Sequence, residues 1–221
     1  FNDNIITGLY FKNLNEVDKA EGYLFGGEGN IAKAESKYEI KILAAYAQIR
    51  KSITNKLTMD NSIRIEFNDI SYIGKSFGYS NDTLPDVNAN KSYILNGFKS
   101  SLNYKIGSRS NIFAHFSYGY KSGGINQQPY VSDQNRVYNP EYLSNFELSY
   151  KTKTEKHYLN LSYFYNKRFD QQVSISAQQN QTDPNSFYYF TSNSKNAGFS
   201  RGAELEFQYQ IFKNLKLKSS L

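Results

Sequence analysis

Few residues of this 221-residue chain have the types and spacing that enzyme chemistry needs. The chain contains no cysteine, which excludes disulfides, zinc ribbons and thiol catalysis. The two histidines, His115 and His157, fall in different alternating segments, so we expect ordinary pore or surface residues and no metal ligand or general base. The run Gly26-Gly27-Glu28-Gly29 lacks the lysine and hydroxyl residue of a phosphate-binding loop and indicates only a flexible connection.

Acidic residues give the one pattern that resembles a catalytic pair. Glu204 and Glu206 are two residues apart in an alternating segment and so share one face, as a pair of catalytic carboxylates could. Arg64 and Glu66 repeat this spacing elsewhere, which favours a polar face that meets water. Asp133-Gln134-Asn135 lacks the other positions of a calcium loop. We therefore predict no catalytic residue, no metal site and no cofactor.

Composition narrows the class of protein further. The formal net charge of +6 fits nucleic acid or anionic lipid as a partner, but no run typical of an RNA- or DNA-binding domain is present, so we predict no nucleic-acid binding. Aromatic residues make up 16% of the chain, which argues against disorder along its whole length. No stretch approaches the roughly 20 apolar residues of a membrane-spanning helix.

Two-residue alternation dominates the chain and predicts β-strands. In 112–121, Ile112, Phe116 and Tyr118 alternate with His115 and other polar residues. About nine segments follow this rule, and most reach the roughly 9–11 residues with which a tilted strand crosses a bilayer. The predicted strands are 5–14, 38–49, 57–67, 93–105, 112–121, 142–151, 158–173, 201–211 and 215–221.

The connections between these segments alternate in length. Short ones are expected at 50–56, 106–111, 152–156 and 212–214, and long ones at 15–37, 68–92, 122–141 and 174–200. In an up-and-down meander, alternate connections lie at the same end of the sheet. Short turns at one end and long loops at the other are typical of outer-membrane barrels, with the turns in the periplasm. The short turns are also rich in lysine and arginine, which suits phosphates of the periplasmic leaflet.

The two faces of the strands suggest which side meets lipid. Tyrosines border the apolar rows and suit the membrane interface, with Tyr118, Tyr120, Tyr163, Tyr165 and Tyr209 as examples. Arg64, Glu66, Glu204 and Glu206 lie on the opposite rows and are predicted to face a hydrated lumen. A soluble sandwich would also alternate, so this pattern alone leaves both folds open.

Four runs in family order resemble the barrel of TonB-dependent outer-membrane receptors. The first is 111–126, NIFAHFSYGYKSGGIN, which is similar to a YASYSKGYKSGGFN-like strand. The others are YNPEYLSNFELSYK at 138–151, LSYFYNKRFDQQV at 161–173, and NAG at 196–198 followed by GAELE at 202–206. In the first half, TMDNSIR at 58–64 resembles the family's LTAGLR, with Asn61-Ser62 where Ala-Gly is usual.

The resemblance implies an all-β antiparallel meander, part of a transmembrane barrel of 22 strands that a separate plug domain fills. Residues 1–221 would then be a partial barrel domain without its plug or its C-terminal strands. The implied function is uptake of a scarce ligand such as a ferric siderophore, haem or cobalamin, with no enzymatic activity. The implied location is the outer membrane of a Gram-negative bacterium, in contact with its lipid and lipopolysaccharide.

The implied partners are the ligand, expected to be a metal chelate, and the TonB energising complex, which would bind an N-terminal region outside this sequence. Cationic and aromatic side chains suit anionic, ring-rich chelates, so we expect first contacts at Lys121, Tyr130, Arg136 and Tyr138. Two alternatives stay open from the residues alone. One is a passive porin or adhesin barrel, and the other is a soluble β-rich module that binds carbohydrate or has a structural role.

Overall fold

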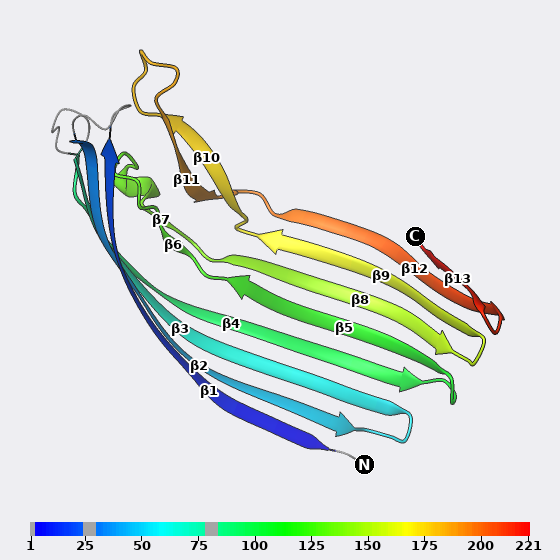
Figure 1. Cartoon of the computed structure of the whole chain (residues 1–221). Coiled ribbons are helices and arrows are strands. Elements are labelled where there is room, and N and C mark those ends of the chain that lie inside the picture. Colours follow the sequence, from blue (N-terminus) through cyan, green and yellow to red (C-terminus); the bar gives the residue numbers. More distant parts are fainter. Residues whose placement is uncertain (1–2, 24–29, 78–83) are drawn as a thin grey trace.

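The computed structural model describes residues 3–23, 30–77 and 84–221. The described chain forms one curved antiparallel sheet of nine strands, with small hairpins above it (Figure 1). The sheet order is β1-β2-β3-β4-β5-β8-β9-β12-β13, so each strand pairs with its neighbours along the chain once the hairpins are set aside. The strands are β1 (Asn4–Tyr23), β2 (Asn30–Ser52), β3 (Leu57–Phe77), β4 (Val87–Lys105), β5 (Ser110–Lys121), β8 (Glu141–Lys153), β9 (His157–Phe169), β12 (Gly198–Phe212) and β13 (Leu215–Ser220). This confirms the predicted meander.

The register sorts alternate residues onto two faces. Ile63 on β3 lies opposite Ala47 and Phe98, whereas the next residue, Arg64, lies opposite Tyr46 and Gly97. We call the face with Ile63 the outer face and the face with Arg64 the inner face. Large apolar side chains on the outer face remain open, and no second layer covers them in the described part of the chain; examples are Leu9 (81% exposed), Ile94 (77%), Phe11 (70%), Ile63 (52%) and Leu161 (48%). A sandwich would bury these rows, so the structure supports a face that meets lipid.

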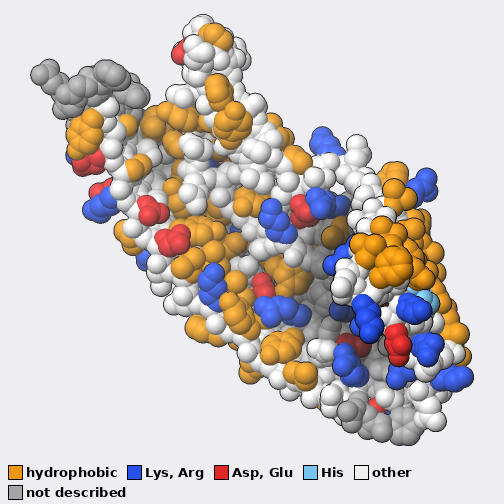
Figure 2. Space-filling view, turned by 45° about the vertical axis from the view of Figure 1, so that its right-hand side comes forward, with side chains coloured by type: hydrophobic (Ala, Val, Ile, Leu, Met, Phe, Trp, Pro, Cys, Tyr) orange, Lys and Arg blue, Asp and Glu red, His pale blue; other side chains and the backbone are white. Residues whose placement is uncertain are grey.

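The short turns and the long connections lie at opposite ends, as predicted. The turns after β2, β4, β8 and β12 are at one end of the sheet (Figure 1). Lysine and arginine side chains gather at this end in the space-filling view (Figure 2). Arg50, one of the rim cations, turns to the inner face and pairs with Asp60 at 2.9 Å. It is therefore directed away from the lipid phosphates that the sequence suggested as its partners.

Two of the predicted long loops are largely wrong, because the strands continue into them. β1 and β2 pair from Asn4 and Arg50 up to Tyr23 and Asn30, and β3 and β4 pair up to Gly74 and Val87. Cross-strand ion pairs support the extension, including Lys19 with Glu35 at 3.1 Å and Lys33 with Glu21 at 3.4 Å. Outer side chains become mainly polar beyond Phe11 and Phe67, with isolated apolar residues such as Val17 and Ile73, which hid the alternation in the sequence. The glycine run at 26–29 and Asn81-Asp82 lie outside the described residues.

The other two loops contain short strands. The 122–141 segment carries β6 (Gly124–Ile125), a 3₁₀ turn (Asp133–Asn135) and β7 (Val137–Tyr138). The segment after β9 forms the hairpin of β10 (Gln172–Gln178) and β11 (Phe187–Asn193). β9 ends at Phe169, earlier than the predicted 173, and Asp170 follows with a φ of 51°. This left-handed residue breaks the ladder and lets the hairpin rise from the sheet (Figure 1).

The buried core lies where the 122–141 loop folds onto the inner face of the strand extensions. Its buried members are Ile70, Tyr72, Val87, Tyr93, Leu95 and Ile125. The Tyr93 hydroxyl donates to the Tyr138 carbonyl at 2.7 Å and fixes the loop on the sheet. The loop therefore has a defined position against the wall of strands.

The buried side-chain amide of Asn126 joins the 122–141 loop to the β10–β11 hairpin. Asn126 Nδ2 donates to the carbonyls of Asn135 (2.7 Å) and Thr191 (2.8 Å), and its Oδ1 accepts the Thr191 N–H at 2.8 Å. Asn193 adds a second link, because its Nδ2 donates to the Asn139 carbonyl at 3.0 Å and its Oδ1 accepts the Asn139 N–H at 2.7 Å. The two extracellular segments are thus hydrogen-bonded into one unit.

The face assignment predicts opposite outcomes for two neighbouring residues of β12. In the complete protein, Leu205→Arg should reduce the free energy of unfolding in lipid vesicles by about 2–4 kcal/mol, because the arginine would meet hydrocarbon. Glu204→Arg, on the inner face, should cost much less, because that face meets water. Urea unfolding of both variants measures the difference. Equal losses would contradict the assignment.

Asn126→Ala should loosen the hairpin, because the substitution leaves the Thr191 N–H and carbonyl without partners, at about 1–3 kcal/mol each. We expect hydrogen exchange at 187–193 to accelerate by roughly tenfold or more. Gln181→Ala, at the exposed hairpin tip, is the matched control and should leave exchange unchanged. Unaltered protection at 187–193 in the Asn126 variant would show that the link does not hold the hairpin.

Candidate functional site

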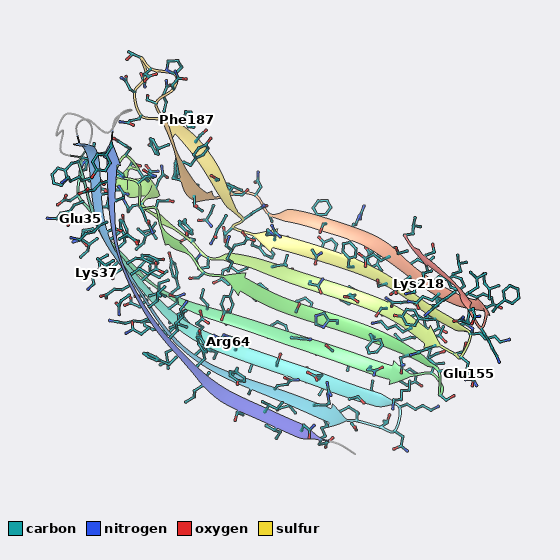
Figure 3. All side chains as sticks on the ribbon, in the orientation of Figure 1. Glu35, Lys37, Arg64, Glu155, Phe187 and Lys218 are labelled. Atoms are coloured by element: carbon teal, nitrogen blue, oxygen red, sulfur yellow. The ribbon has the colours of Figure 1, made fainter. Side chains whose placement is uncertain are left out.

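Arg64 and Glu66 form a polar pair on the inner face of β3, and Figure 3 shows the position of Arg64 on the sheet. Arg64 Nη2 lies 2.5 Å from Glu66 Oε2, and the guanidinium lies 5.3 Å from the ring centroid of Tyr10. Glycines stand close by on both sides of this row, with Gly97 opposite Arg64 and Gly8 opposite Tyr46. The missing side chains at these positions leave room for the Tyr46 ring over Gly8 and the Tyr120 ring beside Gly97. Both residues of the pair share the polar inner face, and their position in a lumen stays a prediction.

Tyr120 belongs with this pair and not to the lipid-facing row in which the sequence placed it. Its hydroxyl accepts from Arg64 Nε at 3.0 Å and donates to Glu66 Oε2 at 3.1 Å. The ladder between β4 and β5 ends at Phe98 and Tyr118, so the next residues of β5 are no longer held by β4. The Tyr120 ring then crosses Gly97, where a Cβ atom would lie 3.4 Å from it.

Glu204 and Glu206 lie on the inner face of β12, far along the sheet from Arg64. β4, β5, β8 and β9 separate the two pairs, so they do not form one site. Glu206 Oε1 accepts a hydrogen bond from Gln208 Nε2 at 3.1 Å. Neighbouring inner-face partners of Glu204 include Ser162 across the strand pair. These carboxylates fit a hydrated wall.

The four predicted ligand contacts have different surroundings. Arg136 donates to the carbonyls of Asn126 (2.8 Å), Gln128 (2.7 Å) and Val131, so its guanidinium holds the loop together. Burial lowers the pKa of Arg136, and these carbonyls offset part of that cost. The Tyr138 ring lies over Gly124, and burial raises the pKa of Tyr138.

Lys121 is more accessible than these two residues, whereas Tyr130 is half-buried as they are. Lys121 ends β5 on the inner face, opposite Glu141, and its side chain is exposed. The Tyr130 ring lies 5.9 Å from the ring of Tyr188 on β11 and so joins the aromatic side of the hairpin. On the other side of that hairpin, Phe187 and Tyr189 form an exposed edge-to-face pair with centroids 5.5 Å apart (Figure 3).

The sequence interpretation missed this hairpin and one cation beneath it. Arg168 lies on the inner face near the extracellular end of β9, with its Nε 3.3 Å from Glu141 Oε1. The run FYYF at 187–190 was a usable signal, because aromatic residues are enriched in strands, but four aromatic residues in a row show no alternation. Arg168 gave no signal of its own, because it appeared as one polar residue in a polar row.

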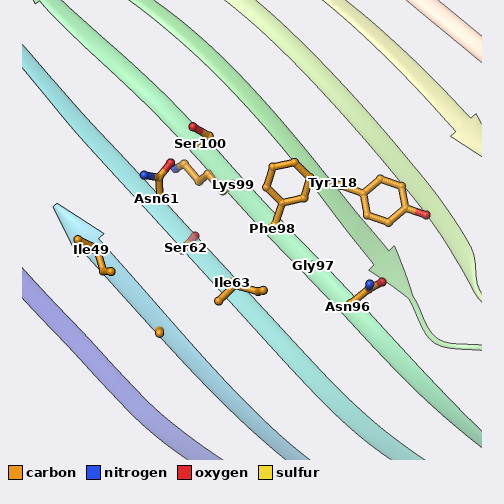
Figure 4. A pocket seen from close by; sticks show the side chains of 11 residues that line it. Ile49, Asn61, Ser62, Ile63, Asn96, Gly97, Phe98, Lys99, Ser100 and Tyr118 are labelled. Carbon is orange, nitrogen blue, oxygen red and sulfur yellow. The ribbon is translucent and has the colours of Figure 1, made fainter. Parts of the chain in front are cut away.

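The outer face carries a hollow of about 530 Å³ between β2, β3, β4 and β5 (Figure 4). Apolar walls from Ile49, Ile63 and Phe98 surround it, and Asn61 and Asn96 also reach it. It opens on the lipid-facing side, away from the loops. We therefore do not place ligand transport there.

Neither histidine has the surroundings of a metal ligand. His115 Nδ1 lies 2.9 Å from Ser101 Oγ, and His157 Nδ1 lies 2.8 Å from Thr154 Oγ1. Among the described residues, no group of three or more His, Cys, Asp or Glu side chains could hold a metal ion. The helix search over the same residues finds none with the length and hydropathy needed to cross a membrane.

Comparison with known proteins agrees with this architecture. The family model described as "TonB dependent receptor-like, beta-barrel" matches residues 2–221. No curated protein matches the sequence.

Several solved structures share the fold, although sequence identity is low. The ferric yersiniabactin uptake receptor FyuA from Yersinia pestis has a TM-score of 0.74 and 17% identity, over 96% of this chain and 30% of its own. The ferric-catecholate import receptor Fiu from E. coli K12, in its closed form, has a TM-score of 0.65 and 13% identity, over 99% of this chain and 35% of its own. A double mutant of the Serratia marcescens hemophore receptor HasR, in complex with its hemophore HasA and heme, has a TM-score of 0.56 and 11% identity, over 93% and 40%.

The chain thus spans well under half the length of these structures, and their likeness concerns the fold. The family match covers nearly every residue and rules out a soluble carbohydrate-binding module. The chain belongs to the TonB-dependent receptors, a family of Gram-negative outer-membrane transporters that are not enzymes, and it forms part of the receptor barrel.

Proposed function

We propose that this barrel region belongs to a receptor that imports a scarce metal chelate, of the ferric siderophore type, through energy from the TonB complex. The observation that carries the proposal is the division of the sheet into an apolar outer face and a polar inner face that begins beneath ordered extracellular loops. Such a wall can lead a polar ligand past the bilayer. Matching structures include receptors described for ferric yersiniabactin, for ferric catecholates and for a hemophore with heme, which supports a chelated metal as cargo.

Lys121 and Tyr130 are the proposed first contacts among the predicted loop residues. A lysine at the mouth attracts anionic chelates, and a tyrosine ring can stack on their aromatic groups. We assign Arg136 and Tyr138 a supporting role, because the donors of Arg136 are engaged with loop carbonyls and the ring of Tyr138 packs on Gly124. They shape the loop that presents the other two.

A passive porin is the competing function within the outer membrane. It would need no energy source and would let the ligand equilibrate across the membrane. The hydrogen-bonded loop unit folded over the inner face favours a receptor that holds its ligand before transport. Energy dependence separates the two functions.

Growth under iron limitation tests the proposal. A receptor that carries this region, expressed in a host without its own ferric receptors, should restore growth on at least one ferric chelate. Deletion of tonB in that host should abolish the growth, and expression of an unrelated porin should not support it. Growth that persists without TonB at the same low chelate concentration would indicate a passive pore and contradict the proposal.

A further inference from the structure

A hollow of about 310 Å³ lies at the extracellular end of β8, β9 and β12. Its lining residues are Leu143, Asn166, Arg168, Gln171, Gly198, Phe199 and Ser200. Gly198 lies opposite Arg168 in the register, at the position where a larger residue would project into the space. A Cβ atom there would meet only Gln171 Oε1, at 3.7 Å. The hollow is open because this position is glycine.

The polar groups around the hollow include donors from Arg168 and Ser200, and one acceptor, Gln171 Oε1, beside Gly198. Asn166 Oδ1 accepts from Asn145 Nδ2 at 2.7 Å, and its own Nδ2 donates to Ser200 Oγ at 3.3 Å. The Ser200 hydroxyl proton is therefore free to point to a ligand. Within the described residues, the terminal nitrogens of Arg168 make no hydrogen bond, because Glu141 engages only Nε.

Glu141 fixes Arg168 without offering a free oxygen to the hollow. Its Oε1 faces Arg168 Nε at 3.3 Å, and its Oε2 accepts the backbone N–H of Gln172 at 2.8 Å. The glutamate side chain is 14% exposed, so the pair is largely sheltered on the acidic side, whereas the arginine is 44% exposed. The exposed part of the pair is thus the guanidinium.

We propose that this hollow is a subsite for an anionic oxygen group of the transported ligand, such as a carboxylate or a deprotonated catechol. A planar guanidinium with two free nitrogens can bind such a group in a bidentate manner, and the Ser200 hydroxyl can add a third donor. This inference rests on the proposed function and assigns a charge class to its cargo. Arg168 would be a specificity-determining residue for anionic chelates.

The test uses the complete receptor in vesicles and two probes, a trianionic ferric tris-catecholate and a neutral ferric tris-hydroxamate. The wild-type receptor should bind the anionic probe more tightly. Arg168→Gln should weaken binding of this probe by about tenfold or more, because a charged hydrogen bond is lost. Lys167→Gln is the matched control, since Lys167 precedes Arg168 in β9 and lies on the outer face. This variant should bind the anionic probe with the affinity of the wild type.

Gly198→Leu provides a second variant that leaves every charge in place. It should fill the hollow and also weaken the anionic probe by about tenfold or more, and Arg168→Lys should recover part of the affinity that Arg168→Gln loses. Unchanged affinity in both Arg168→Gln and Gly198→Leu, or binding of the neutral probe alone, would overturn the subsite while the proposed function stands. If neither probe binds and no ferric chelate supports TonB-dependent growth, the proposed function fails and the subsite fails with it.

Discussion

The fold depends on the need to pair every backbone N–H and C=O group inside a bilayer. Hydrocarbon offers no hydrogen-bond partner, so strands that cross it must be continuous and must pair on each side. The seven strands from β2 to β12 in the sheet pair with a neighbour on each side, and β1 and β13 form its two edges. Because side chains of a paired strand alternate strictly, the same ladder determines which residues meet lipid and which meet the lumen. The polar inner face is therefore a direct consequence of backbone pairing.

This constraint ends where the strands leave the membrane, and there the structure becomes less regular. The dense apolar outer rows of β1 to β3 end at Phe11, Leu43 and Phe67, and above them polar side chains and ion pairs alternate with a few isolated apolar residues. Loops can also fold inward at this level, because water is available to their unpaired groups. Here the side-chain amides of Asn126 and Asn193 form the hydrogen bonds with backbone groups that a neighbouring strand forms within the sheet. The extracellular part thus has structure that depends on specific side chains.

The sequence predicted the sheet well because hydrocarbon enforces alternation. The nine strands, their antiparallel order, the short-turn end and the inner position of Arg64 follow from period and turn residues. The lengths of β1 to β4 could not be predicted in the same way. Their outer rows become mainly polar above the membrane, and their inner rows mix core residues such as Ile70 and Tyr72 with polar ones, so the apolar alternation weakens. Contacts such as Asn126 with Thr191 join residues 65 positions apart and leave no local pattern. The alternation rule placed Tyr120 on the wrong face, because the pairing of β5 with β4 already ends at Tyr118.

The strands of the sheet differ in length, so the wall they form differs in height. β1, β2, β3 and β4 contain 20, 23, 21 and 19 residues, whereas β5, β8 and β9 contain 12, 13 and 13. At roughly 3.3 Å per residue, the longer group rises some 20 Å or more above its shorter neighbours. The extracellular wall of the sheet is therefore uneven: it is tall at β1 to β4 and low at β5, β8 and β9. The wall is lowest where β9 ends, and the β10–β11 hairpin rises beside that low part (Figure 1).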